Sequence, residues 1–281
     1  MQRSLSILCA TLLLGAYALP AHGDFLYSDF SSVDGLKLNG NASQVGDVLR
    51  LSSASSFSSG STFTTNQVDL DGGNSFSTFF QFRIGNSGGL GDADGPGADG
   101  LVFVVQTVSN NVGAAGGGIG YSGINPSLGI EFDTYNNGPG YGDPDGNHVG
   151  IDLNGNIVSV QTQPEAVRFN NGEIWNAWVD YNGATDGLEV RWSLSDVRPS
   201  LPQLSITLDL VSILGQDTAF VGFTSATGSG FGNHDLLRWE FRGEFAPIGV
   251  PEPASIVMMS LGSIMVGWIS RRRAKQTTRA T

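Results

Sequence analysis

Short β-prone runs alternate with turn signals from Asp24 to Pro247, and this alternation limits the fold more than any other feature of the sequence. The runs are rich in the aromatic and β-branched residues that strands favour, as in SFSTFFQFRI, GLVFVVQT, IVSVQT (157–162), LSITLDL (204–210) and LLRWEFRGEF. Asn-Gly and Asp-Gly pairs, which are typical of hairpin turns, separate many of them. No helical period appears away from the termini. About a dozen short strands predict an all-β protein, a jelly-roll β-sandwich of two antiparallel sheets, with residues 24–247 as one domain.

Residues 1–23 are typical of a secretory signal peptide. Arg3 precedes an apolar run from Leu5 to Leu19, and Ala21-His22-Gly23 offers small residues at the two positions that signal peptidase recognises. We therefore expect a signal helix that is removed by cleavage after Gly23. The single cysteine, Cys9, lies in this segment, so the mature protein is expected to contain neither a thiol nor a disulfide.

Residues 248–281 form a second targeting segment. An apolar stretch from Ala254 to Ser270 is just long enough to cross a bilayer as a transmembrane helix, and the basic cluster Arg271–Arg273 would then stay in the cytoplasm. Together with Pro251-Glu252-Pro253, these features resemble the PEP-CTERM sorting signal. That resemblance implies a Gram-negative-type bacterium, an envelope sortase that acts on the tail, and export of the domain to the cell surface or extracellular matrix. A plain C-terminal membrane anchor is the alternative.

The charge of the chain excludes one class of partner. The formal net charge is −12, and charged residues make up only 14% of the chain. Of the 14 Lys and Arg residues, six lie in the terminal segments, which leaves eight for the domain between them. The six are Arg3, Arg271, Arg272, Arg273, Lys275 and Arg279. A nucleic acid is therefore excluded as a partner, because no basic patch is left to neutralise phosphates, whereas a neutral ligand or a cation fits this field.

The stretch GIEFDTYNNGPGYGDPDGNHVGID, residues 129–152, begins as a strand and continues into an acidic loop. Alternate side chains of a strand share a face, so Glu131 and Asp133 should point together. Two carboxylates so placed repel each other, and a cation between them removes the penalty. Carboxylate and amide oxygens suit calcium, and an imidazole such as that of His148 suits a transition ion such as manganese. We therefore expect two ions here; the alternative is a solvated acidic loop without metal.

The pattern Glu-x-Asp-x-Tyr-x-Asn, then Asp-Pro, then His five residues after that Asp, is similar to the metal loop of legume-type (L-type) lectins. These concanavalin-like proteins fold as a jelly-roll sandwich with adjacent transition-metal and calcium sites. The implied ligands are Glu131 and His148 for the transition ion, Asp133 and Asp143 for both ions, and the Tyr135 carbonyl with the Asn137 side chain for calcium. One extra residue separates Asn137 from Asp143 relative to the commonest family spacing. Asp145 therefore stays open as the second bridging acid, although Asp143-Pro144 and the spacing to His148 favour Asp143.

Three more stretches resemble the same lectins and imply a sugar site. In GADGLVFVVQ, Asp99 would accept hydrogen bonds from two sugar hydroxyls and would follow a cis Ala98-Asp99 peptide. In GAAGGGIGY, Gly117 would donate its backbone N–H to the sugar. The Asn137 side-chain nitrogen would face the sugar, and the Tyr135 ring would pack against it. The loop from Gly228 to Gly232 would form a variable rim, with Gly228 and Ser229 as contacts, while His234 would help to order that loop.

These features predict a secreted or surface-displayed, metal-dependent carbohydrate-binding protein without catalysis. The expected partners are a carbohydrate or exopolysaccharide and the envelope sortase, and homo-oligomerisation stays open. One alternative is a glycosidase, some of which carry Glu-x-Asp-x-x-Glu on one strand of a related sandwich, but the third residue after Asp133 is Asn136. The other is a surface structural or adhesion protein that has lost sugar binding, against which Asp99 and Asn137 count.

Overall fold

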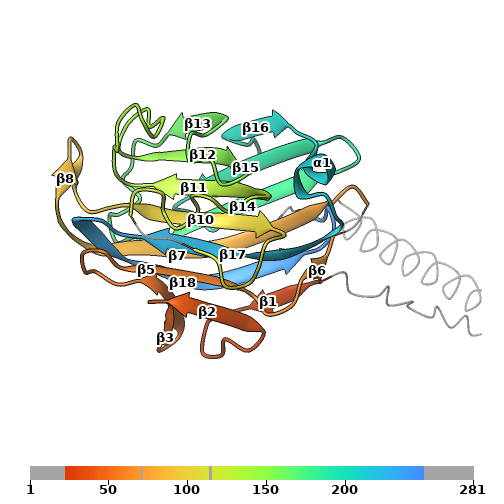
Figure 1. Cartoon of the computed structure of the whole chain (residues 1–281), viewed down its shortest axis with the longest axis horizontal. Helices are drawn as coiled ribbons and strands as arrows, with labels where there is room; N and C mark the ends of the chain where they lie inside the picture. The colour runs from red at the N-terminus through yellow and green to blue at the C-terminus, as the bar shows by residue number, and fades with distance from the viewer. Residues whose placement is uncertain (1–22, 71, 114–115, 250–281) are drawn as a thin grey trace, which may run out of the picture.

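The computed structural model describes residues 23–70, 72–113 and 116–249. Within these residues, two eight-stranded sheets lie face to face, and their strands pair antiparallel (Figure 1). Sheet A has the order β16 (Leu204–Thr207), β15 (Gly187–Ser193), β14 (Trp175–Asn182), β7 (Phe76–Gly89), β18 (Gly230–Arg242), β4 (Val48–Ser52) and β3 (Ser43–Val45), with β1 (Phe25–Tyr27) paired to β18. The predicted two-sheet antiparallel β-sandwich is confirmed.

Sheet B carries the sequence stretches that were singled out for function. Its order is β13 (Gln161–Pro164), β12 (His148–Leu153), β11 (Ser127–Asp133), β10 (Gly100–Gln106), β17 (Thr218–Ala226), β5 (Ser59–Thr64) and β2 (Leu36–Gly40), with β6 (Val68–Asp69) paired to β17. A separate hairpin of β8 (Gly91–Asp92) and β9 (Gly95–Pro96) projects from the end of β7 (Figure 1). The central strands β10, β11 and β12 are buried along almost their whole length.

Aromatic rings from both sheets form the core between them. The ring of Phe80 on β7 meets that of Phe223 on β17 edge-on at a centroid distance of 4.9 Å, and Phe223 meets Trp239 of β18 at the same distance. From β11, Ile130 and Phe132 join this core. Because side chains alternate along a strand, the residues between them are left on the outer face of sheet B.

A second apolar cluster covers part of that outer face. Side chains of β5 and β10 pack there against the loop that links β10 to β11, and the cluster comprises Phe63, Val102, Val104, Ile119, Tyr121 and Ile124. The Tyr121 hydroxyl accepts hydrogen bonds from Ser127 Oγ at 2.8 Å and from the Gly155 N–H at 3.2 Å. These contacts hold the loop against the sheet and so position Gly117.

One short helix departs from the sequence interpretation. Residues 204–210 were expected as one strand, but β16 ends at Thr207 and helix α1 (Leu210–Leu214) follows. The Asp209 side chain caps it by accepting the Ser212 N–H at 2.9 Å, and Gly215 ends it with a φ of 71°. The expected strand at 157–162 is also displaced, because β13 begins only at Gln161. Both differences lie outside the central strands.

The described chain begins and ends on one side of the sandwich. In Figure 1 β1 lies toward the right and β18 points to the right, whereas β10 begins on the left, beside the β8–β9 hairpin. Among the described residues no helix is long and apolar enough to span a membrane. The signal helix within residues 1–23 and the transmembrane helix expected from Ala254 to Ser270 lie outside the described residues, apart from Gly23.

Candidate functional site

The acidic residues of β11 gather on the outer face of sheet B. Glu131 and Asp133 are only 5% and 3% exposed, although they point away from the core between the sheets. On the neighbouring strand, His148 is directly opposite Asp133 and is also buried. The predicted alternation therefore places three ionisable side chains together under the loop that joins β11 to β12.

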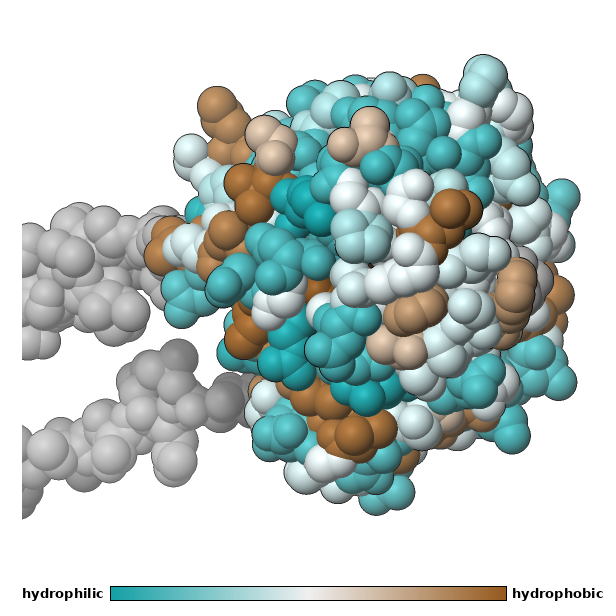
Figure 2. Space-filling view, turned by 90° about the vertical axis from the view of Figure 1, so that its left-hand side faces the viewer, coloured by the Kyte–Doolittle hydropathy of each residue, from teal (hydrophilic) through white to brown (hydrophobic). Residues whose placement is uncertain are grey.

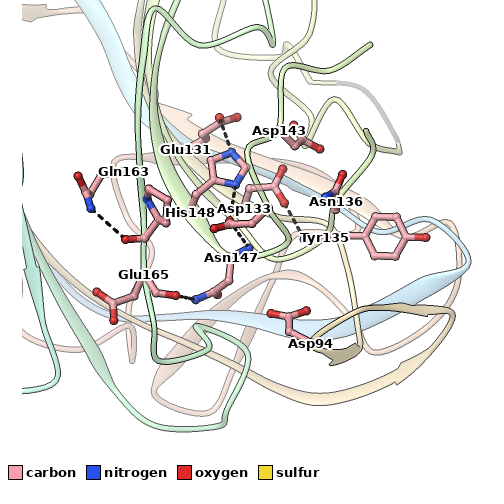
Figure 3. Close-up of polar contacts among 12 residues, drawn as sticks. Asp94, Glu131, Asp133, Tyr135, Asn136, Asp143, Asn147, His148, Gln163 and Glu165 are labelled. Atoms are coloured by element: carbon pink, nitrogen blue, oxygen red, sulfur yellow. Dashed lines mark hydrogen bonds and ion pairs between the residues drawn. The ribbon is translucent and has the colours of Figure 1, made fainter. Parts of the chain in front are cut away.

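Asp143 returns from that loop to complete the cluster (Figure 3). Ligand atoms of Asp133, Asp143 and His148 all lie within 4.8 Å of one another. Glu131 Oε1 lies 3.4 Å from His148 Nε2. The Asn137 N–H donates a hydrogen bond to Asp143 Oδ2 at 2.6 Å, which joins the two ends of the loop between β11 and β12.

The electrostatics of this cluster favour a cation. Burial, together with the charges of Glu131 and Asp143, raises the pKa of Asp133 well above its usual value. Burial also raises the pKa of Asp143. Burial alone would lower the pKa of His148, but the hydrogen bond to Glu131 and the surrounding carboxylates raise it. A divalent ion would relieve the repulsion that these shifts express, and two carboxylates with an imidazole suit a transition ion.

A buried oxygen beside the cluster lacks a partner. Among the described residues, Asn137 Oδ1 is buried and accepts no hydrogen bond. An amide oxygen is a ligand that calcium accepts, and a buried acceptor without a partner is costly. The donor set therefore fits the calcium ion that the sequence analysis expects beside the transition ion.

The geometry favours Asp143 over Asp145 as the second acid. Asp143 belongs to the group of converging ligand atoms, and Asp145 does not. The Asp145 side chain is 43% exposed, lies 3.6 Å from His148 Nδ1 and accepts the Asn147 N–H at 3.0 Å. Asp145 thus shapes the turn before β12.

Two residues that were not predicted from the sequence support the cluster. Ser159 Oγ lies 2.7 Å from Glu131 Oε1 and 2.6 Å from Oδ1 of the fully buried Asp152. The Ser159 hydroxyl has one proton, so it can donate a hydrogen bond to only one of the two carboxylates. Burial and the charge of Glu131 raise the pKa of Asp152 well above its usual value, so a protonated Asp152 can supply the second proton. Asp152 lies four residues after His148 on the same strand, so strand alternation places both side chains on one face and could have predicted it. Nothing in the sequence pointed to Ser159.

The β8–β9 hairpin also braces the loop that joins β11 to β12. Asp92 Oδ2 accepts the Asn136 N–H at 2.8 Å. A pocket of about 490 Å³ lies between this hairpin and residues 144–147, with Asp92, Asp94 and Glu165 in its wall. The contact joins residues 44 positions apart in the sequence, so no local pattern could have predicted it.

Asp99 lies at the start of β10, beside the cluster. The Ala98–Asp99 peptide is cis, as the resemblance implied. The Asp99 backbone is held on both sides, because its N–H donates to the Ala226 carbonyl at 3.1 Å and its carbonyl accepts the Thr134 N–H at 2.9 Å. Its side chain is 3% exposed, and Oδ2 has no partner among the described residues. Burial and the charge of Asp143 raise the pKa of Asp99 to about 7.

Glycines allow the other predicted sugar contacts to approach. A Cβ on Gly117 would lie 2.3 Å from Asn137 Nδ2, and one on Gly228 would lie 3.6 Å from Asp99 Oδ2. A Cβ on Gly117 would also lie 3.2 Å from Tyr141 Cε1, and Tyr141 was not predicted as a neighbour. The structure therefore joins Gly117 to Asn137 and Gly228 to Asp99.

The remaining two predicted sugar contacts are held by backbone hydrogen bonds. The N–H of Tyr135 donates to Asp133 Oδ1 at 2.6 Å, and the ring is half-buried. The Ser229 carbonyl accepts the Leu90 N–H at 3.1 Å, which ties the rim loop to the end of β7.

Comparison with known proteins places this geometry in a family. The model of the legume lectin domain matches residues 22–252. The chain belongs to the legume lectin domain family. A second model, the PEP-CTERM protein-sorting motif, matches residues 249–274. Both resemblances inferred from the sequence are thereby confirmed.

Proteins similar to the chain include plant receptor kinases with an L-type lectin domain and lectins of known structure. The L-type lectin-domain containing receptor kinase VIII.1 of Arabidopsis thaliana is 34% identical over 195 residues, which cover 66% of this chain and 26% of the relative. The chain thus spans about a quarter of that protein's length. The basic winged bean lectin with Tn-antigen is 29% identical with a TM-score of 0.64, covering 78% of this chain and 96% of the lectin. The Bauhinia forficata lectin in complex with GalNAc is 25% identical with a TM-score of 0.66, with the same coverage.

Substitution of Gly117 tests the packing of this legume lectin domain. In Gly117→Ala the new methyl group would overlap Asn137 Nδ2 and force that side chain to move. We expect a loss of sugar affinity of about tenfold, or ~1.4 kcal/mol, with little change in the melting temperature, because Gly117 is half-buried in a loop. Isothermal titration with a monosaccharide that the wild type binds measures the loss of affinity. Gly140→Ala is the control, because a methyl group at Gly140 would meet no other atom. Gly116→Ala is unsuitable, because the φ of 82° at Gly116 would strain any other residue.

His234 supports the rim from inside the sandwich. It is fully buried, and its Nδ1 forms a hydrogen bond with Ser52 Oγ. Ser52 Oγ in turn lies 2.9 Å from Ser225 Oγ. His234 therefore joins β18 to β4 and, through Ser52, to β17, and its burial excludes contact with a ligand.

Acid should destabilise the domain through His234. Burial lowers the pKa of His234 to about 4, partly opposed by the charge of Asp235, whereas the unfolded value is 6.5. Between these pH values His234 is therefore protonated in the unfolded state and neutral in the native state. The contribution of His234 to stability is present above pH 6.5 and is lost as the pH falls toward 4, by on the order of 3 kcal/mol. Denaturant unfolding of the wild type and His234→Gln at several pH values measures it; identical pH slopes would contradict it.

Proposed function

We propose that this legume lectin domain binds carbohydrate at the Asp99–Asn137 surface, with bound metal ions supporting the site and no catalysis. The observation that carries the proposal is the position of Asp99 beside the cluster of Asp133, Asp143 and His148. Asp143 links the two, because its charge acts on Asp99 and its carboxylate holds the Asn137 N–H. The similar lectins with Tn-antigen and with GalNAc support a galactose-type ligand as the first to test.

The metal ligands would be divided between two ions. Glu131, Asp133, Asp143 and His148 would hold a transition ion such as Mn²⁺, and Asp133, Asp143, the Tyr135 carbonyl and Asn137 Oδ1 would hold Ca²⁺. The ions would supply positive charge that fixes these side chains before a ligand arrives. Asn137 would then present its nitrogen, and Asp99 its carboxylate, to sugar hydroxyls. Such preorganisation reduces the entropy lost on binding.

Asp99, Asn137 and the Gly117 N–H would fix the orientation of one sugar unit. The Tyr135 ring would pack against its apolar face, and Gly228 and Ser229 would border it. A shallow site of this kind is expected to bind a monosaccharide on the order of 1 mM. Display of many copies at a surface would raise the avidity. The PEP-CTERM motif supports export to the cell surface and processing by an envelope sortase, with an exopolysaccharide as a suitable partner.

A glycan array tests the proposal directly. The metal-loaded domain, residues 24–247, is applied to an array with terminal galactose, N-acetylgalactosamine, glucose and mannose, and positive sugars are confirmed as methyl glycosides by titration. Binding to at least one class is expected. A reducing-sugar assay on the bound polysaccharides should show no turnover, because Asn136 stands where related glycosidases carry an acid and its N–H is engaged by Asp92. The absence of binding to every class would refute the proposal, and turnover would refute its non-catalytic part.

A further inference from the structure

Phe57, in the loop between β4 and β5, is an exposed aromatic residue in an unusual backbone conformation. Its side chain is 73% exposed, and its φ is 58°. The other described non-glycine residues with positive φ are Asn74, Asn86, Ile119, Asn154 and Asp186. Asn and Asp tolerate this conformation, and Ile119 is buried in the second apolar cluster. Phe57 gains neither advantage, so its side chain contributes nothing visible to the stability of the free protein.

The conformation of Phe57 is imposed by its attachment to the rim loop. The Phe57 N–H donates to the Gly228 carbonyl at 2.9 Å. On either side of it, the Ser58 N–H donates to Thr227 Oγ1 and the Thr227 N–H donates to the Ser58 carbonyl, both at 2.8 Å. The Ala54 N–H donates to Asn233 Oδ1 at 2.7 Å. These bonds hold the backbone that carries the Phe57 ring at the edge of the proposed site.

Phe57 lies next to Gly228, which in turn lies next to the proposed sugar contact Asp99. Gly228, which holds the Phe57 N–H, also lies against Asp99, because a Cβ on Gly228 would be 3.6 Å from Asp99 Oδ2. Gly228 thus contacts both Phe57 and Asp99, which places Phe57 within reach of an oligosaccharide bound at Asp99. The face of the molecule seen in Figure 2 is mostly hydrophilic or neutral, with hydrophobic residues only scattered over it.

We propose that Phe57 forms a second subsite, which stacks against the sugar unit next to the one held by Asp99 and Asn137. A pyranose has a face of C–H groups that an exposed aromatic ring can cover, while its hydroxyls stay in water. Because the backbone of Phe57 is already held, only its side-chain torsions lose freedom on contact. The subsite selects an oligosaccharide or polysaccharide over a free monosaccharide. This inference rests on the proposed sugar site and adds to it the class of ligand.

Phe57→Asn separates the two roles that the ring could have. Asn tolerates a positive φ, so the variant should fold with an equal or higher melting temperature. The metal-loaded wild type and variant are titrated with the methyl glycoside that the array identifies and with a trisaccharide ending in the same sugar. We expect the trisaccharide affinity of the variant to fall about five- to tenfold, as for the loss of roughly 50 Å² of apolar contact. The methyl glycoside affinity should not change.

Two further variants serve as controls. Phe57→Tyr keeps an aromatic ring and should retain the trisaccharide affinity. Phe245→Asn alters another partly exposed phenylalanine, 43% exposed and beyond the end of β18, and should change neither affinity. Unchanged trisaccharide affinity in Phe57→Asn would overturn the subsite while leaving the proposed sugar site in place. An equal loss for both ligands would also overturn it, since the ring would then act on the first sugar. Wild type that binds neither ligand would refute both proposals.

Discussion

Removal of divalent metal with a chelator is expected to abolish sugar binding. Without a cation, Asp133, Asp143 and Glu131 repel one another in a buried position, and burial already raises the pKa of Asp133 well above its usual value. Asn137 Oδ1 would lose its proposed ligand, and the Asn137 side chain would no longer be fixed. We expect a loss of at least a hundredfold, or about 2.7 kcal/mol, in titrations with a methyl glycoside. Addition of Ca²⁺ and Mn²⁺ should restore binding.

The metal should also stabilise the fold, and this effect can be measured without sugar. An ion present at a hundredfold excess over its Kd adds about 2.7 kcal/mol, which corresponds to roughly 5–10 °C in melting temperature for a domain of this size. Asp143→Asn should behave like chelated wild type, whereas Asp145→Asn should keep both metal and sugar. If protein shown to be metal-free by elemental analysis binds sugar as before, the site does not depend on metal.

Replacement of Asp99 should abolish sugar binding while the protein remains folded. Asp99 would accept hydrogen bonds from two sugar hydroxyls, and bonds to a charged acceptor are worth about 1.5–3 kcal/mol each. Asp99→Ala should therefore weaken binding by at least about a hundredfold. Its carboxylate is desolvated and near the charge of Asp143, which raises its pKa to about 7. Asp99→Asn removes that unfavourable charge, so its melting temperature should equal or exceed that of the wild type.

The measurement for Asp99 is a pair of titrations with the same methyl glycoside, supported by thermal unfolding and metal analysis. Asp69→Asn, on the exposed side of β6 at the other end of the sandwich, removes the same charge and should bind normally. Metal content should stay unchanged in Asp99→Asn, because the proposed metal ligands are intact. Normal affinity in a folded Asp99→Ala protein would place the sugar elsewhere.

Strand alternation made much of the fold and of the acidic cluster predictable from sequence. Ile130 and Phe132 had to face the core, so Glu131 and Asp133 had to lie together on the opposite face, and the register of β11 with β12 then brought His148 opposite Asp133. The short helix α1 escaped because five residues cannot show a period, although Asp209 and Gly215 mark its two ends. Cap residues were the available signal there.

Contacts between loops could not be predicted in the same way. Asp92 reaches Asn136, and Phe57 reaches Gly228, across 44 and 171 positions of sequence, and neither loop has a repeating pattern that fixes its partner. Their positions depend on where the sandwich places the ends of β7, β4 and β17. Alternation says which face a strand residue occupies, but nothing about which loops meet at the edge of a sheet.

The described chain begins at Gly23 and ends at Gly249 on one side of the sandwich, while β10 begins on the other (Figure 1). The β8–β9 hairpin, Asp99 at the start of β10, and the loop after β17 all belong to that far side. If the domain is tethered to a cell surface through its PEP-CTERM segment, the loops proposed to bind sugar lie at the end of the sandwich away from Gly249. Neighbouring molecules on the same surface would present these loops in parallel, so a long polymer could bridge them without any contact between the proteins.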